Sequence, residues 1–213
     1  MDVQVEFKSD FIPSKNDLAV LFCFQTNNKS SKNVSFALES WPKDIATIFQ
    51  SIKSTSLFKA AKKESFTFAD KLGNPYMVFG LGEKKSWEKS DDSKEKMRRY
   101  LSACLKKVLS LPAQRVLVDT NSLIELIPSI ELLPMIQEVV ELSNYSFTAY
   151  KSSDKATESK NKKHNKTFQL YTKKTLLKPS LQAIQDESKK QKIFAKAANF
   201  CRDLANDPPN FLH

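Results

Sequence analysis

Apolar residues along the chain follow two periods that alternate from segment to segment. Compact or alternating apolar runs, which are typical of strands, occur at residues 17–24, 65–69, 76–81, 115–119, 145–150 and 167–171. Apolar stripes at helical spacing occur at residues 41–52, 91–108, 133–143 and 193–204. Because strands are interleaved with helices, the sequence predicts an α/β layer fold rather than a β-sandwich or a helical bundle.

Local signals refine several of these elements. Asp91 and Asp92 stand at the start of the second predicted helix, where they offer an N-cap and acidic side chains in the first turn. Pro134 lies inside the third helical stripe, so that helix is expected to begin or to kink there. The strands at 145–150 and 167–171 are separated by a polar, lysine-rich segment, and we expect them to form a hairpin with a solvated tip.

The chain is short of the residues on which most local ligand sites depend. Of its 213 residues, three are glycine and two are histidine, whereas an average domain of this length holds about 15 glycines. Phosphate motifs of the G-x-G-x-x-G and G-x-x-x-x-G-K-[ST] types are absent, as are the metal motifs H-E-x-x-H and C-x-x-C. Two of the glycines, Gly80 and Gly82, follow an apolar strand, and we expect a structural turn there rather than a small-ligand loop.

Basic residues are concentrated in one part of the chain. The net charge is +10, and residues 151–196 contain 13 lysines but four acidic residues. Within the predicted hairpin tip, Lys160, Lys162, Lys163 and Lys166 offer phosphate contacts, and nucleic-acid binding through them would weaken steeply with salt. Ser, Asn and Thr rather than aromatic residues separate these lysines, which favours a charged, solvated loop. A basic nucleic-acid-binding module remains the alternative function.

No catalytic or metal-binding constellation emerges from the residues, so we predict neither kind of site in this chain. Glu138 and Glu141 form a carboxylate pair, but they are expected on the polar side of a helix, where solvent accounts for them. No serine or cysteine has a recognisable general base.

The cysteines indicate a reducing compartment. Cys23, Cys104 and Cys201 are odd in number and lie in apolar patterns, which predicts buried free thiols in the cytoplasm. Residues 1–7 alternate apolar and polar types and lack the form of a signal peptide. No run approaches the roughly 20 apolar residues of a membrane span, so no membrane partner is expected.

The end of the chain resembles a known protein family. Residues 201–210 (CRDLANDPPN) are similar to the A-R-D-L-x-N-x-P-P-N segment that links the two domains of leucyl aminopeptidases, the cytosolic di-metal exopeptidases. Residues 76–84 (YMVFGLGEK) resemble the V-x-L-V-G-L-G-K strand and loop of that family. Residues 145–152 (YSFTAYKS) resemble its Y-x-F-D-x-Y-K-S hairpin, without the aspartate. Together these matches cover the chain from about residue 65 onward.

The resemblance implies that the chain is the N-terminal, non-catalytic domain of such an enzyme. The implied fold is a single domain with a three-layer mixed β-sheet flanked by helices, similar to a macro domain, over residues 1–182. An interdomain helix and linker would follow over residues 183–213. The linker residues that match the family are Arg202, Asp203, Asn206, Pro208, Pro209 and Asn210. The family's catalytic motif, N-T-D-A-E-G-R, occurs nowhere in the chain, so we expect the chain alone to be inactive.

The implied parent is a metal-dependent leucyl aminopeptidase that removes N-terminal residues from peptides. In that family two divalent metal ions, zinc or manganese, bind in the catalytic domain, and the enzyme is a homohexamer. This chain would hold no cofactor. Its partner would be the catalytic domain of the same enzyme, and the role of this chain would be in assembly or regulation. Macro domains that bind ADP-ribose use glycine-rich loops, which this chain lacks, so a nucleotide ligand is not expected.

Overall fold

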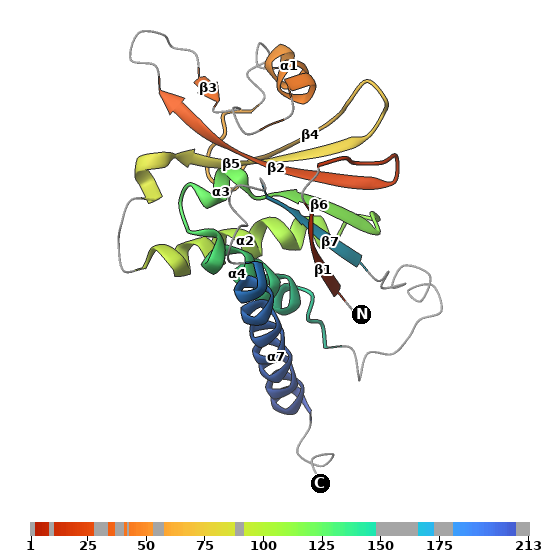
Figure 1. Ribbon diagram of the computed structural model, residues 1–213, viewed down its shortest axis with the longest axis vertical. Helices are drawn as coiled ribbons and strands as arrows, with labels where there is room; N and C mark the ends of the chain where they lie inside the picture. Colours follow the sequence, from red (N-terminus) through yellow and green to blue (C-terminus); the bar gives the residue numbers. More distant parts are fainter. Residues whose placement is uncertain are drawn as a thin grey trace.

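The computed structural model describes residues 3–8, 11–27, 34–36, 41, 43–52, 58–87, 92–147, 166–172 and 181–207. Within these residues a mixed β-sheet has helices on both faces (Figure 1), which confirms the predicted three-layer α/β fold. The strands are β1 (Val3–Lys8), β2 (Asp17–Asn27), β3 (Val34–Phe36), β4 (Ser65–Ala69), β5 (Pro75–Glu83), β6 (Arg115–Asp119) and β7 (Lys166–Tyr171). The α-helices are α1 (Lys43–Ile52), α2 (Ser93–Leu109), α3 (Asn121–Ile124), α4 (Ser129–Ser143) and α7 (Leu181–Asn206), and a 3₁₀ turn spans Lys84–Trp87.

The sheet is parallel in its centre and antiparallel at two margins. Its strand order is β1-β7-β6-β2-β5-β4, and β3 pairs with β2 off this path. Strands β1, β7, β6, β2 and β5 pair in parallel, whereas β4 runs antiparallel to β5 and β3 antiparallel to β2. Parallel neighbours require crossover connections, and helices supply these between the strands.

The central strand β2 divides the interior into two cores, because successive side chains of a strand point to opposite faces. Leu18, Val20 and Phe22 pack in a core with residues of α2 and α4. Ala19 and Leu21 pack in a second core with residues of α1. Figure 1 shows α1 on one side of the sheet and α2 and α4 on the other. Burial on both faces explains why β2 reads as a continuous apolar run rather than as an alternating one.

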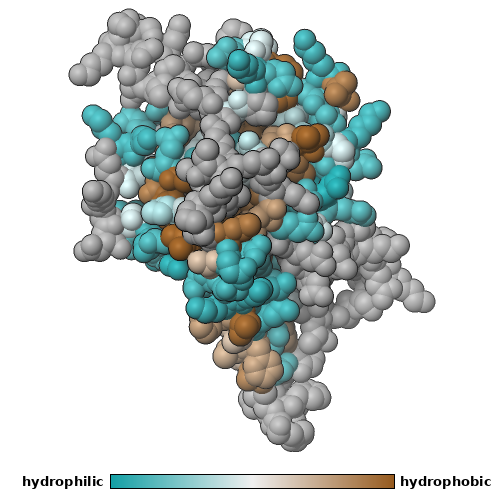
Figure 2. Space-filling model, viewed as in Figure 1, coloured by the Kyte–Doolittle hydropathy of each residue, from teal (hydrophilic) through white to brown (hydrophobic). Residues whose placement is uncertain are grey.

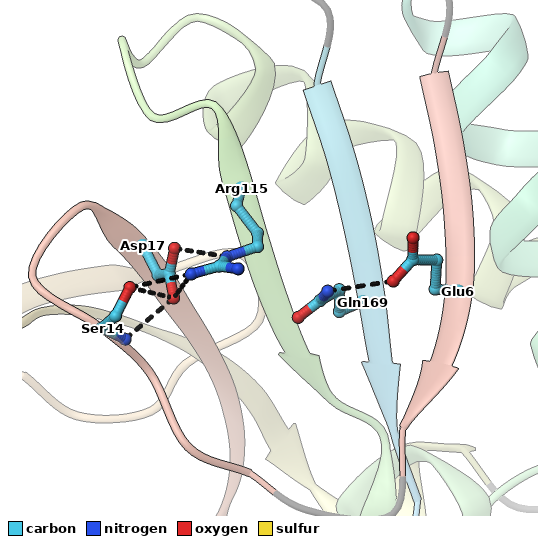
Figure 3. Close-up of polar contacts among 5 residues, drawn as sticks. All are labelled: Glu6, Ser14, Asp17, Arg115 and Gln169. Atoms are coloured by element: carbon cyan, nitrogen blue, oxygen red, sulfur yellow. Dashed lines mark hydrogen bonds and ion pairs between the residues drawn. The ribbon is translucent and has the colours of Figure 1, made fainter.

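Polar side chains pair across the sheet at register positions (Figure 3). Asp17 and Arg115 are register partners at the starts of β2 and β6, and the Arg115 guanidinium donates Nε to Asp17 Oδ1 at 2.6 Å and Nη2 to Asp17 Oδ2 at 2.9 Å. Ser14 adds its backbone N–H and hydroxyl to Asp17 Oδ2, each at 2.8 Å. Gln169 donates to its register partner Glu6 at 3.0 Å across β7 and β1. These pairs hold the parallel strands in register.

Burial raises the pKa of Asp17, but hydrogen bonds from Arg115 and Ser14 outweigh burial and hold the pKa of this carboxyl below its usual range. The ionised form therefore stabilises the fold above the unfolded-state pKa of about 3.9. This contribution is lost as the pH falls through the lower, folded-state pKa.

The substitution Asp17→Asn is expected to lower the free energy of unfolding at pH 7 by about 2 kcal/mol, because it removes a charged acceptor from a bidentate guanidinium. The difference from the native chain should persist down to about pH 4 and shrink below it, as the pH falls through the lowered pKa of the native carboxyl. Urea unfolding at several pH values measures both effects. Equal stabilities at pH 7 would contradict the role given to this pair.

The glycines of β5 serve close packing of backbones. Gly80 is buried within the strand, and a Cβ there would lie 2.3 Å from the Ala61 carbonyl oxygen and 2.4 Å from the Ala60 carbonyl carbon. Gly82 has φ +70° near the point where the register between β2 and β5 shifts. The expectation of a turn at these residues is wrong, because the strand continues through them to Glu83.

Residues 145–150 and 167–171 do not form the predicted hairpin. The second segment lies in β7 as predicted, but β7 pairs in parallel with β6 on one edge and with β1 on the other. No edge is left for an antiparallel partner. The described part of the first segment, residues 145–147, is not a strand, and residues 148–150 lie outside the described residues.

The starts of two helices can be compared with the prediction. Helix α4 begins at Ser129, with Pro128 at its N-cap, so Pro134 lies within the helix rather than at its start. Helix α2 has Asp92 at its N-cap as predicted, but among the described residues the Asp92 side chain makes no capping hydrogen bond. Asp91 lies outside the described residues. Within the described part of the chain, no helix combines the length and the apolar character needed to cross a membrane.

Candidate interdomain surface

Helix α7 is the element predicted to join this domain to a second one. It packs beside α4 and extends away from the sheet toward the C-terminus (Figure 1). Ile184, Ser188 and Ala195 are its buried residues, and their spacing places them on one side of the helix. That side faces α4: Asn199 Nδ2 donates to the Glu141 carbonyl oxygen at 3.2 Å.

The opposite side of α7 carries a stripe of exposed apolar residues. At about 100° per residue, these side chains fall within roughly one third of the helix circumference, away from the residues that face α4. The large members of this apolar stripe are Ile193, Phe194, Phe200 and Leu204, which are 65%, 63%, 61% and 42% exposed. Figure 2 shows hydrophobic residues at the lower end of this helix. Exposed apolar side chains gathered on one face mark an interaction surface.

The apolar stripe corrects one expectation about the cysteines. Cys23 and Cys104 are buried as predicted, but Cys201 is exposed. Cys201 lies on the side of α7 that faces away from α4, among the residues of the apolar stripe. Its apolar surroundings in the sequence therefore belong to a surface and not to the core.

Three of the predicted linker residues converge on Tyr145, which closely follows α4. The Tyr145 hydroxyl donates to Asp203 Oδ1 at 2.9 Å and accepts from Asn206 Nδ2 at 3.2 Å. The Arg202 guanidinium lies 5.5 Å from the centre of the Tyr145 ring and donates to the Leu142 carbonyl oxygen at 3.4 Å. We call these contacts the Tyr145 clamp. The clamp fixes the last turn of α7 against the end of α4.

The remaining linker residues, Pro208, Pro209 and Asn210, lie outside the described residues. Sequence reasoning did not single out Tyr145 as a partner of the linker, although it opens the segment that resembles the family's Y-x-F-D-x-Y-K-S pattern. Desolvation raises the pKa of Tyr145, the Asn206 hydrogen bond opposes that shift, and the hydrogen bond to Asp203 adds to it. The phenol therefore stays protonated at neutral pH and keeps donating to Asp203.

The substitution Tyr145→Phe should loosen the end of α7 without unfolding the domain. It removes one hydroxyl and two hydrogen bonds, which is expected to lower the local stability of the last turns of α7. Amide hydrogen exchange is expected to speed up about fivefold at residues 199–206, while exchange in β2 stays unchanged and serves as the internal control. Unchanged exchange in the last turns of α7 would contradict the clamp.

Lys166 is the one proposed nucleic-acid contact that lies within the described residues. This side chain is 3% exposed and donates to the carbonyl oxygens of Val108 and Leu111. Burial lowers the pKa of its ammonium. Lys166 therefore anchors β7 to the end of α2 and does not belong to an exposed basic surface. Lys160, Lys162 and Lys163 lie outside the described residues.

The carboxylate pair on α4 is divided between two environments. Glu138 accepts from Arg98 Nε at 3.0 Å. Glu141 is 8% exposed, because α7 covers it, and Lys192 approaches it at 3.7 Å. The expectation that both carboxylates are solvated is therefore wrong for Glu141. Among the residues that the structure describes, no group of three or more His, Cys, Asp or Glu side chains is placed to hold a metal ion.

The carboxyl ends of β6 and β7, where ligands often dock in α/β sheets, are occupied by internal polar contacts. Thr120 Oγ1 lies 2.7 Å from Thr172 Oγ1 and donates to the Tyr171 carbonyl oxygen at 2.8 Å. Ser122 Oγ donates to the Phe22 carbonyl oxygen at 2.9 Å. These hydroxyls join the ends of β6 and β7 to each other and to the middle of β2, and their role is structural.

Comparison with known proteins relates this architecture to larger enzymes. No protein-family model matches the chain, and no curated protein sequence matches it. A solved structure of a tomato leucine aminopeptidase mutant matches 99% of this chain with a TM-score of 0.70 and 17% identity, and the match covers 39% of that enzyme. The bottromycin maturation enzyme BotP, solved in complex with Mn, matches 93% with a TM-score of 0.56 and 15% identity, and 33% of that enzyme is covered. At these identities the likeness establishes the fold: the chain has an aminopeptidase-related α/β fold that spans between a third and two fifths of the enzymes it resembles.

Proposed function

We propose that this chain is the non-catalytic domain of a leucyl aminopeptidase-like metallopeptidase, and that α7 docks the catalytic domain of that enzyme. The observation that carries the proposal is the match to the tomato enzyme, which takes in 99% of this chain but leaves most of that enzyme's chain uncovered. The linker-like sequence at residues 201–210 supports the same assignment.

The apolar stripe supplies the docking surface in this proposal. Full burial of a large apolar side chain stabilises an interface by about 1.5–3 kcal/mol, and four such side chains are 42–65% exposed on α7. A catalytic domain joined to the end of α7 would meet the stripe at a high effective concentration, so a small contact area would suffice. The Tyr145 clamp would set the direction in which the connecting chain leaves α7.

Metal chemistry belongs to the catalytic domain in this proposal. The parent enzyme would carry two divalent ions, zinc or manganese, and a metal-activated water would attack the scissile carbonyl of a peptide. The homohexamer is likewise proposed for the parent and not for this chain. The work of the present domain would be assembly or regulation of access to the active site.

The nucleic-acid alternative loses one of its four residues, because Lys166 is turned into the fold. The other three lie outside the described residues. No contact within the described part of the chain favours the alternative, so we prefer the peptidase-domain assignment.

The chain alone is expected to show no hydrolysis of leucine p-nitroanilide when Zn²⁺ or Mn²⁺ is added. The reason is that the described residues contain no group of three or more His, Cys, Asp or Glu side chains that could hold a metal ion. A complete leucine aminopeptidase under the same buffer and metal conditions is the positive control. Metal-dependent turnover that co-purifies with the 213-residue chain would contradict the assignment.

Sequencing the native gene beyond codon 213 tests directly whether the chain belongs to a longer enzyme with a catalytic domain. The proposal expects an open reading frame that continues into a catalytic domain with two-metal ligands. A stop codon in the native gene at this point, with no adjacent gene for such a domain, would overturn it.

A further inference from the structure

Beside the Tyr145 clamp, α2, α4 and α7 surround an open pocket of about 520 Å³. This volume is in the range of small-molecule sites. The clamp residues Tyr145 and Arg202 line this pocket together with residues of α2 and α4. The pocket plays no part in the proposed function, and its distinguishing feature is the charge of its lining residues.

The carboxylates of the pocket are already neutralised. Glu138 pairs with Arg98 at 3.0 Å, and Glu95 pairs with Arg99 at 2.8 Å. Both ion pairs use a guanidinium Nε as donor. Because these four charges cancel, the net charge of the pocket is set by the other cations that line it.

Two further cations line the same pocket, Lys106 and Arg202. Across the described ranges of the chain, no carboxylate comes within ion-pair distance of either one. Arg202 donates to the Leu142 carbonyl oxygen and to Asn199 Oδ1, which are neutral acceptors. The pocket therefore carries a surplus of two positive charges.

A pair of hydroxyls adds a donor to this surplus. Ser102 Oγ from α2 and Ser143 Oγ from α4 lie 3.1 Å apart at the pocket wall. Two hydroxyls hold two protons, and their mutual hydrogen bond uses one of them. The second proton is free to donate to an oxyanion. Val139 and Leu142 give the pocket an apolar part as well.

We propose that this pocket binds a phosphomonoester. A phosphomonoester carries about −1.5 to −2 charges at pH 7 and three acceptor oxygens, which matches two unpaired cations and a hydroxyl donor. Arg202 supplies the guanidinium fork that suits phosphate oxygens, and Lys106 supplies a mobile point charge. The ester group would lie against the apolar part. The ligand is a phosphorylated small molecule or a phosphorylated side chain of a peptide, since both present the same group.

Isothermal titration of the full chain at fixed ionic strength tests the site with two probes, glycerol 2-phosphate and an acetyl-Ala-phosphoserine-Ala amide. We expect one saturable site per chain for at least one probe, with a Kd at or below the millimolar range. Tighter binding of the peptide would assign the ligand to proteins, and tighter binding of glycerol phosphate to metabolites. No saturable binding of either probe up to 10 mM, about ten times a 1 mM Kd, would overturn the proposal.

Charge-neutralising variants locate the site. Lys106→Gln is the main variant, because the exposed Lys106 side chain can be changed without disturbing the fold. Arg202→Gln is the second. Each should weaken binding about tenfold, as loss of a charged hydrogen bond does. Lys71→Gln, on the exposed turn between β4 and β5, makes the same charge change away from the pocket and should leave the Kd unchanged. Native affinity in both Lys106→Gln and Arg202→Gln would contradict the site.

Discussion

Replacing Phe49 by alanine is expected to lower the free energy of unfolding by about 4 kcal/mol, the range measured for large buried aromatic residues. Phe49 is 1% exposed and sits in α1, the described helix whose residues pack in the second core. Its ring centroid lies 5.1 Å from that of Trp41 and 5.7 Å from those of Phe58 and Phe68. The truncation would leave a cavity among rigid rings that cannot close in on it. Urea unfolding, read as the midpoint and its slope, measures the change.

The same substitution at Phe200 is the matched control. Phe200 is 61% exposed on the apolar stripe, so Phe200→Ala should change the stability of the isolated chain by less than about 0.5 kcal/mol. Similar losses at Phe49 and Phe200 would contradict the burial assigned to one of them. A Phe200→Ala chain of unchanged stability can also be used to test whether a catalytic domain docks on the apolar stripe.

Replacing Gly80 by alanine is expected to lower the free energy of unfolding by about 4 kcal/mol or more, a large part of the roughly 5–15 kcal/mol of an ordinary domain. The new methyl group would meet backbone atoms of Ala60 and Ala61 at 2.3–2.6 Å, and backbone cannot rotate away as a flexible side chain does. The contact is also fixed by hydrogen bonds, because Gly82 N donates to the Ala60 carbonyl oxygen at 2.8 Å and Tyr100 donates to the Gly80 carbonyl oxygen at 2.9 Å.

Gly73→Ala separates this steric cost from the general cost of losing a glycine. Gly73 has φ +82° and open space around its Cα, so only the backbone strain of roughly 1–2 kcal/mol applies. The thermal midpoint of purified protein compares the two variants. A Gly80→Ala chain that folds as well as Gly73→Ala would show that the 60–61 segment can move away from β5.

The sequence predicts best the elements that are marked by a pattern of apolar and turn residues within a few neighbouring positions. The strands at 65–69 and 115–119 were placed within their observed bounds, because alternation and flanking turn residues are readable within a few positions. Pairing was predicted less well. The partner of β7 was sought in the segment just before it, whereas the structure pairs it with β1 more than 160 residues away. Parallel register depends on contacts of this kind, and no short window of sequence contains them.

Sequence separation also determines which contacts of the candidate interdomain surface can be predicted. The linker match identifies Arg202, Asp203 and Asn206, but their partner Tyr145 is remote along the chain: it lies 58 residues from Asp203 and 61 from Asn206. Helical periodicity correctly placed an apolar stripe on α7, yet periodicity does not say which side of a helix meets the core. On α7 the side that packs against α4 is the less apolar one, and for this reason the prediction that Cys201 is buried is wrong.

The position of Cys201 allows the proposed docking surface to be probed by thiol modification. Burial raises the pKa of Cys104 to about 12 and raises that of Cys23 further still. Thiol reagents attack the thiolate, so in the folded chain they will modify Cys201 long before the two buried cysteines. Of the three cysteines, one thus offers a fast-reacting thiol, and it lies within the apolar stripe. The rate of alkylation at that one sulfur reports directly whether another surface is covering the helix.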